Sequence, residues 1–298
     1  VFKSLSKFRK VVNGDFSKYD KMISIYVLLC AFHVIHCVKA HFKKILGEAH
    51  VRILRGVSSD ISNPLLLLGK DLLLQPGSLA SGVLLTFILN NIANSLYIRL
   101  AYLSTLKHRF QDRESCIETF DDNVVFFAGG DDNTYSISDD IAEDFNFLTI
   151  QKYFKSIGLK YTPADKTDTK YKYEDISEAT IFKRKWVFDK EHNIWKAPLD
   201  RKSIGKMLTI CLRSKHVNFA EQQRQALSQA IPELAQYPKE EFNRIYKILK
   251  EFYPDLDEDY DTILHKQATS EVTPWVPNFD MVASEGVAPL SFDEGDSQ

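Results

Sequence analysis

The sequence has few cysteines, and they follow no metal-binding pattern. Four cysteines are spread over 298 residues, and no two form a CxxC pair. This scarcity excludes a disulfide framework, and it favours reduced thiols in a cytosolic protein. The chain also lacks an initiator methionine and a signal peptide at Val1. We therefore expect it to be a piece of a longer polypeptide.

The chain has no excess of charge of either sign. It carries 38 Lys and Arg against 40 Asp and Glu, a formal net charge of −2. Six of the acids lie between residues 264 and 298 with a single base, so the remainder is slightly basic. A cluster of acids can hide a basic channel in such a total. Net charge therefore neither indicates nor excludes nucleic-acid binding.

Long apolar runs are also missing. The longest candidate, residues 22–38, has 17 residues and includes Tyr26, His33 and His36. That length is at the short limit for crossing a bilayer, so the segment is predicted to be a buried helix and not a membrane span. With 44% hydrophobic and 26% charged residues, the composition is typical of a soluble globular protein that is large enough for two domains.

Hydrophobic periodicity predicts an alternation of strands and helices. A short buried strand at Val11-Val12 is expected to end in a turn at 13–15, and residues 124–138 read as a hairpin with acids at its tip. A second hairpin is expected within residues 179–196. Helices are predicted at about 17–46, 83–105, 141–157, 204–211, 218–230 and 239–252, with Pro232 and Pro238 between the last two. No structure is predicted from about residue 268 onward.

Two acids occupy the ends of predicted strands. Asp15 follows a buried strand, and Asp131 lies at the tip of the hairpin. A carboxylate in such a place costs free energy unless a cation compensates it, and oxygen ligands suit Mg²⁺. A pair of Mg²⁺ ions can hold the attacking and leaving oxygens of a phosphoryl transfer. The alternative is an ordinary turn, because Asp and Gly are common in turns.

Several motifs occur in the chain order of one polymerase family. They are Asp15-Phe-Ser-Lys-Tyr-Asp20, Ser81-Gly82-x-x-x-Thr86-x-x-x-Asn90, Gly130-Asp131-Asp132, Tyr161-Thr-Pro-Ala-Asp-Lys166, Ile181-Phe182-Lys183-Arg184 and Ala197-Pro-Leu-Asp-Arg-Lys-Ser-Ile. Over about residues 8–215, the sequence resembles the picornavirus-like RNA-dependent RNA polymerases. Gly-Asp-Asp alone is weakly specific, whereas the ordered series with its internal spacings is strongly specific.

The resemblance implies an α+β fold. The expected parts are a right-hand polymerase palm, made of an antiparallel sheet with packed helices, and an all-helical thumb, with most of the fingers missing. The implied divisions are palm at 1–48, a fingers-type insertion at 49–75, palm at 76–196, helical thumb at 197–267 and an acidic, flexible tail at 268–298. The fragment alone is expected to be inactive without the upstream fingers.

The resemblance also implies catalytic roles. Asp15 and Asp131, supported by Asp132, would hold two Mg²⁺ or Mn²⁺ ions, and Lys166 would protonate the pyrophosphate leaving group or stabilise its charge. The implied reaction is template-directed RNA synthesis from nucleoside triphosphates (NTPs) for viral genome replication. The implied partners are RNA template and primer, NTPs, the upstream fingers of the same polypeptide and other viral replication proteins. The implied location is the host cytoplasm, at membrane-associated replication complexes.

Further motif residues would bind the nucleotide and the primer. Asp20 and Asn90 would form a hydrogen-bonded pair that reads the ribose 2′-OH. The nucleotide-binding set is Asp20, Ser81, Gly82, Thr86 and Asn90, and the primer grip is Phe182, Lys183 and Arg184.

One position departs from the family. The residue before Gly130-Asp131-Asp132 is usually Tyr, but here it is Gly129, which puts local rigidity or primer contact in doubt. Two other readings remain open: a reverse transcriptase, which would favour a bulky steric gate, and a catalytically incomplete polyprotein fragment that acts as an RNA-binding or interaction module.

Overall fold

The computed structural model describes residues 1–41, 48–79, 82–83, 85–164 and 171–269. The chain divides into two compact units, Val1–Ser203 and Ile204–Gln298. The first unit combines an antiparallel sheet with helices, and the described part of the second is helical. The α+β class predicted from the sequence is therefore confirmed.

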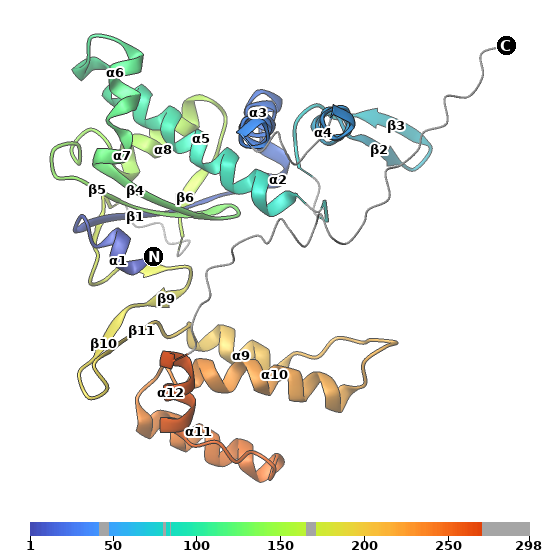
Figure 1. Cartoon of the computed structure of the whole chain (residues 1–298), viewed down its shortest axis with the longest axis vertical. Coiled ribbons are helices and arrows are strands. Elements are labelled where there is room, and N and C mark those ends of the chain that lie inside the picture. The colour runs from blue at the N-terminus through green and yellow to red at the C-terminus, as the bar shows by residue number, and fades with distance from the viewer. Residues whose placement is uncertain (42–47, 80–81, 84, 165–170, 270–298) are drawn as a thin grey trace. The chain divides into compact units, whose positions relative to one another are not determined.

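The first unit is built on one antiparallel sheet. Its strand order is β4-β5-β1-β6, and β7 also pairs with β1 (Figure 1). The strands are β1 (Lys10–Phe16), β4 (Val124–Gly129), β5 (Asp132–Ile137), β6 (Tyr161–Pro163) and β7 (Glu174–Asp175). The hairpin predicted at residues 124–138 is present as β4 and β5. Strand β1, which carries Asp15, lies directly beside β5.

Strand β1 continues where the sequence predicts a turn. Asn13, Gly14 and Asp15 are all paired with β5, so the predicted turn is wrong. A Cβ atom at Gly14 would lie only 1.8 Å from the hydroxyl oxygen of Tyr161. Glycine is therefore required for close approach of a tyrosine, as glycine in a strand often is. This close approach explains why glycine, a residue common in turns, occurs inside strand β1.

Two helices cover one face of the sheet. Helix α5 (Thr86–Leu106) and helix α8 (Phe147–Ser156) lie on the same side of the strands (Figure 1). The core between helices and sheet is rich in aromatic residues, and Phe16 contacts Tyr19, Tyr97, Phe154 and Tyr161 with ring centroids 4.9–5.8 Å apart. Burying a side chain of this size stabilises the fold by about 1.5–3 kcal/mol.

The helix predicted from residue 17 to 46 is broken. The structure has α2 (Tyr19–Met22) and α3 (Ile25–His41), with an extended residue, Ile23, between them. The amide of Ser24 donates to the Tyr97 hydroxyl at 2.9 Å, and the Ile23 carbonyl accepts from the Ser78 amide at 3.1 Å. Because tertiary partners satisfy these backbone groups, the helix breaks although its hydrophobic pattern continues. Residues 42–47 of this prediction lie outside the described ranges.

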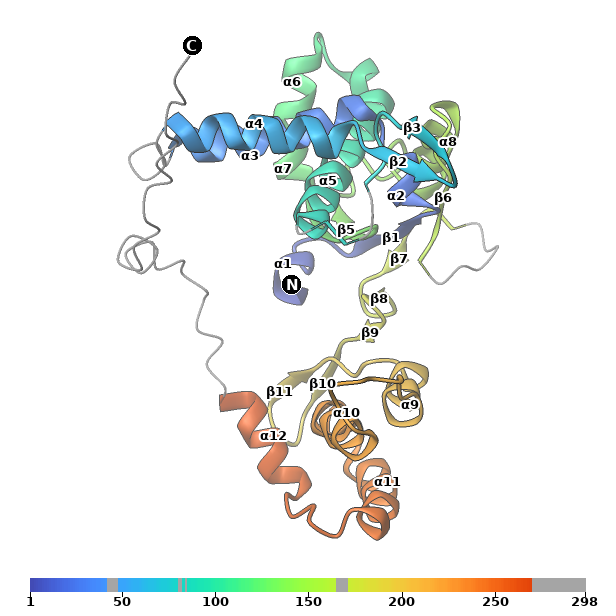
Figure 2. The ribbon, with the colours of Figure 1, turned by 90° about the vertical axis from the view of Figure 1, so that its right-hand side faces the viewer.

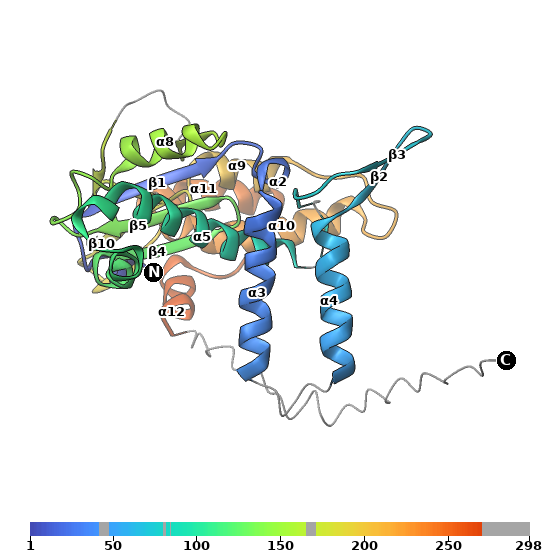
Figure 3. The same cartoon turned by 90° about the horizontal axis from the view of Figure 1, so that it is seen from above.

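A helix and a leucine-rich hairpin follow. Helix α4 (Glu48–Ser62) lies beside α3 (Figure 2 and Figure 3). The hairpin of β2 (Leu65–Leu68) and β3 (Asp71–Leu74) exposes its leucines. Within the described ranges, every helix falls short of the length or the apolar character that a bilayer-spanning segment requires.

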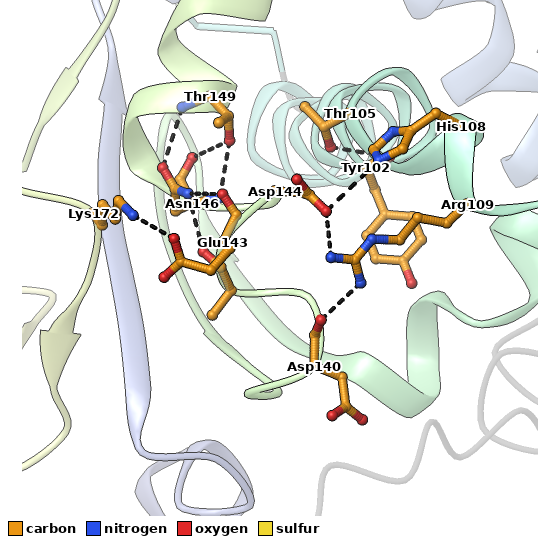
Figure 4. Close-up of polar contacts among 11 residues, drawn as sticks. Tyr102, Thr105, His108, Arg109, Asp140, Glu143, Asp144, Asn146, Thr149 and Lys172 are labelled. Carbon is orange, nitrogen blue, oxygen red and sulfur yellow. Dashed lines mark hydrogen bonds and ion pairs between the residues drawn. The ribbon is translucent and has the colours of Figure 1, made fainter.

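Ion pairs and a helix cap stabilise the segment that follows the C-terminal end of β5. Arg109, in the short helix η1 (Lys107–Arg109), donates to the Asp140 carbonyl at 2.7 Å and forms an ion pair with Asp144 (Figure 4). The Asn146 amide donates to the carbonyls of Ala142 and Glu143. Its oxygen caps α8, which therefore begins at Phe147 and not at the predicted residue 141. The first unit also contains three short helices, α1 (Phe2–Leu5), α6 (Arg113–Glu118) and α7 (Phe120–Asn123).

Residues 179–196 form two short hairpins where the sequence predicts one. They are β8 (Thr180–Ile181) with β9 (Arg184–Lys185), and β10 (Val187–Asp189) with β11 (Ile194–Lys196). In the second, the Asp189 carboxylate contacts Lys196 at 2.5 Å and His192 at 2.9 Å. Hydrogen bonds from these two residues lower the pKa of Asp189 against the opposing effect of its burial.

The second unit is a small helical assembly. Helix α9 (Arg201–Thr209) crosses the division between the units, and α10 (Phe219–Leu234), α11 (Lys239–Phe252) and α12 (Tyr260–Thr269) follow. Pro232 lies inside the last turn of α10, so its predicted place between helices is wrong. The hydrophobic pattern continues past it, because Ile231 and Leu234 are both buried. The sequence did not predict α12.

Candidate active site

The predicted catalytic acids gather at one end of the sheet. Asp132 begins β5, and Asp131 occupies the two-residue turn between β4 and β5. The strand register sets Asp15 directly opposite Asp132. Directly opposed residues of an antiparallel pair project from the same face, so Asp15 and Asp132 share the face opposite the one that contacts α5. Two acids that are 117 positions apart in the printed sequence are thereby brought together.

The environments of these acids differ. Asp15 is buried, with 7% of its surface exposed, whereas Asp131 is exposed at the turn. Burial raises the pKa of Tyr19 well above its usual value, and the charges of Tyr97 and Asp131 raise it further. Burial likewise raises the pKa of Tyr161, to which the charge of Asp15 contributes. Both phenols therefore stay protonated beside the acids.

Helix α5 holds the acidic turn through two asparagines. The Asn91 side-chain oxygen accepts from the Gly130 amide at 2.7 Å. The Asn94 side-chain amide donates to the carbonyls of Gly130 and Asp131, both at 3.2 Å, and to that of Asp132 at 3.4 Å. Sequence patterns alone do not single out this pair. Their i, i+3 spacing on one helix was the available signal, but it does not reveal what the helix contacts.

Further buried contacts support Asn94. Its side-chain oxygen accepts from Asn133 at 3.0 Å, and the Asn133 oxygen accepts from the Tyr161 hydroxyl at 2.6 Å. Asn94 is fully buried and Asn133 is 1% exposed, so each unmade hydrogen bond would be costly. The contact between Tyr161 and Gly14 completes a series that links β1, β5, β6 and α5 around the acids.

The predicted nucleotide-binding residues lie near the start of α5. Thr86 begins the helix and donates from its hydroxyl to the Val83 carbonyl at 2.7 Å. Gly82 has φ of +100°, a conformation that favours glycine. Ser81 and Lys166, both predicted site residues, lie outside the described residues.

Asn90 presents a buried acceptor. Its side-chain oxygen is buried and accepts no hydrogen bond from the described residues. The hydroxyl of Tyr19, next to Asp20 on α2, donates to the Asn90 backbone carbonyl at 3.4 Å. The expected hydrogen bond between the Asp20 and Asn90 side chains is not formed between these two described residues. An ionised carboxylate has no proton to give the Asn90 oxygen, so a ligand hydroxyl is a better partner for it.

The predicted primer grip forms a tight turn. Phe182 and Lys183 are the two residues between β8 and β9. Arg184 donates to the Ala197 carbonyl at 2.9 Å, and the Asp200 amide donates to the Lys183 carbonyl at 2.9 Å. Lys183 is exposed. The turn is thus tied to the segment that leads into α9.

The acids do not form a complete metal cage. Among the described residues, no group of three or more His, Cys, Asp or Glu side chains lies close enough together to hold a metal ion. Mg²⁺ is commonly held by one or two carboxylates with waters and substrate phosphates. Asp15, Asp131 and Asp132 supply oxygen donors of the type that this mode uses.

Comparison with known proteins identifies the family. Residues 1–251 match the model of the viral RNA-dependent RNA polymerase family. The chain is 29% identical over 199 residues to the genome polyprotein of Rice tungro spherical virus (strain A), covering 65% of the chain and 6% of the polyprotein. It is 26% identical over 255 residues to the replicase polyprotein of Acute bee paralysis virus (strain Rothamsted), covering 82% and 13%.

A solved structure has the same fold. The Sicinivirus 3Dpol RNA dependent RNA polymerase matches 89% of this chain and 52% of its own length, with a TM-score of 0.61 and 15% sequence identity. The chain belongs to the viral RNA-dependent RNA polymerase family. Its relatives are picornavirus-like, as its motifs predicted, and it spans about half of that solved polymerase.

Proposed function

We propose that this chain is the catalytic part of a polymerase that copies an RNA template from NTPs during viral genome replication. The observation that carries the proposal is the register of Asp15 opposite Asp132, with Asp131 in the adjoining turn. A buried carboxylate beside two others repels them unless a cation compensates the charge. The sheet thus brings together acids of the kind that metal-assisted phosphoryl transfer uses.

Asp15 and Asp131, supported by Asp132, would hold two Mg²⁺ or Mn²⁺ ions. Bound ions of this kind stabilise the charge that develops on the attacking and leaving oxygens. The role of the chain itself is to fix where the carboxylates lie, and the hydrogen bonds from Asn94 to three carbonyls of the turn serve that purpose. Lys166 would give a proton to the pyrophosphate or stabilise its charge.

Asn90, with Asp20, would select ribonucleotides. The ribose 2′-OH both donates and accepts, so it can satisfy the buried Asn90 oxygen while it accepts a bond from a donor. A deoxynucleotide leaves that oxygen without a partner, and such loss is the strongest basis for rejecting a substrate. Ser81, Gly82 and Thr86 would shape the same pocket.

The remaining assignments follow from this function. The palm would comprise 1–48 and 76–196, the fingers-type insertion 49–75, and the thumb 197–267. Phe182, Lys183 and Arg184 would hold the primer. The partners would be template and primer RNA, the upstream fingers and other viral replication proteins, at replication complexes in the host cytoplasm. The alternative is an RNA-binding module without catalysis.

Replacing one acid tests the function. In the full-length polymerase, Asp131→Asn should lower single-nucleotide incorporation about a thousandfold or more, because metal stabilisation of the transition state contributes several kcal/mol. Its control is Asp139→Asn, at the other end of β5, where the carboxylate pairs with Lys10 at 2.8 Å. That variant should polymerise normally. Incorporation by Asp131→Asn at the wild-type rate would support the non-catalytic alternative.

A further inference from the structure

Gly129 and Phe182 are in close contact. Gly129 is the last residue of β4, just before the acidic turn, and Phe182 lies in the turn between β8 and β9. A Cβ atom at Gly129 would lie 2.8 Å from Cε1 of Phe182 and 3.3 Å from Cδ1 and Cζ. Real Cβ contacts are not this short, so the aromatic ring fills the space that any side chain at position 129 would need.

The turn that presents Phe182 has an unfavourable backbone. Phe182 has φ of +50° and Lys183 has φ of +62°, and such two-residue turns strongly prefer Asn and Gly. Residues with larger side chains persist in this conformation only when their surroundings hold them there. The contact with Gly129 and the backbone bond from Asp200 to Lys183 are two such restraints.

We infer that Phe182 is a positioning residue that replaces, from the neighbouring turn, the side chain that the chain lacks at Gly129. The inference rests on the proposed polymerase function. The acidic turn is held by Asn91 and Asn94 on the side of α5, and the Phe182 ring covers Gly129 from the β8–β9 turn. The contact couples the acids to the adjacent Lys183 and Arg184, and so fixes the primer 3′-OH relative to Asp131.

An exchange of side chains tests the coupling. Gly129→Tyr places a ring where Phe182 lies, so it should slow incorporation by the full-length polymerase. Phe182→Ala leaves a gap and should raise the KM for a primer–template duplex more than it lowers kcat. The double variant should regain activity, with at least about fivefold more incorporation than the product of the single effects predicts, since residues in contact are non-additive. Effects that simply multiply would overturn the inference.

A control and a second readout separate this inference from the function. Phe188→Ala, which removes another partly exposed aromatic side chain from β10, should not rescue Gly129→Tyr. The same cycle measured by the midpoint of urea unfolding reports the contact without catalysis, and it should also be non-additive. If the wild type fails to incorporate nucleotides, the function is wrong, whereas additive unfolding shifts would refute the contact. If Gly129→Tyr does not fold, Gly129→Ala replaces it, because its Cβ alone already displaces the ring.

Discussion

At each end of the central sheet a buried asparagine holds the backbone, but the acids at the two ends differ in their ion pairing. At one end, buried Asn94 donates to three carbonyls of the acidic turn, and at the other, buried Asn146 donates to the carbonyls of Ala142 and Glu143. Acids near Asn146 form ion pairs, Asp144 with Arg109 and Glu143 with Lys172.

Unlike Asp144 and Glu143, Asp131 forms no ion pair with any described residue. Both ends therefore have an ordered backbone, but only at the end near Asn94 does the strand register set two carboxylates, Asp15 and Asp132, directly opposite each other. Backbone contacts hold the fold together at both ends, whereas only the acids near Asn94 are proposed to take part in chemistry.

Among these further experiments, the largest effect is expected for Lys166, the lysine to which the family motif gives the role of general acid. Lys166→Leu should lower the rate of the chemical step about 10²–10⁴-fold, the usual contribution of a general acid, and should alter its pH dependence. Lys166→Arg should retain more activity because it keeps the charge. Pre-steady-state incorporation measures both. Lys155→Leu, on the exposed surface of α8, is the control, and an unchanged rate for Lys166→Leu would exclude the role.

The second experiment compares the two asparagines. Asn94→Leu and Asn146→Leu should each lower the free energy of unfolding by about 1–3 kcal/mol, because each removes a buried side-chain amide that donates to several backbone carbonyls. Only Asn94→Leu should also slow incorporation, by about tenfold or more, because a small displacement of the acids weakens transition-state stabilisation. Urea unfolding and single-turnover kinetics measure the two effects. Equal kinetic losses in both variants would remove the distinction between the ends.

The third experiment concerns sugar selection. Asn90→Ala should reduce the preference for ribonucleotides over deoxynucleotides about tenfold, consistent with about 1–3 kcal/mol for a buried polar group that loses its partner. The ratio of kcat/KM for the two nucleotides is the measurement, and RNA affinity is the control. A ratio that stays at the wild-type value would contradict the assignment.

The smallest effect is expected at the ion-paired end. A hydrogen bond from Lys172 lowers the pKa of Glu143, so this pair stabilises the fold above the pKa of an unfolded glutamate and loses its effect as the pH falls through the lowered value. Lys172→Gln should slightly reduce the acid sensitivity of unfolding and leave polymerisation unchanged. Unfolding midpoints between pH 3 and pH 7 test it; an altered incorporation rate would show that this end also serves catalysis.

Short motifs and local periodicity determined a large part of this protein. The β4–β5 hairpin, helix α5 and the family were predictable, because each depends on neighbouring residues or on a fixed spacing such as that of Thr86 and Asn90. Helix boundaries were less predictable. Ile23 interrupts a continuous apolar pattern because Tyr97 and Ser78 bind its neighbouring backbone, and these partners lie far away in the sequence.

The arrangement of the site was decided by tertiary structure alone. The sequence shows that Asp15 and Asp132 exist, but their opposition depends on the register between β1 and β5. The local sequence assigns Gly14 to a turn, whereas in the structure it lies in β1 against Tyr161. The contact between Gly129 and Phe182 joins residues that have no common local pattern. Such contacts arise from the docking of separate elements. The sequence could therefore predict which residues are candidates for catalysis, but not the residues that hold them in place.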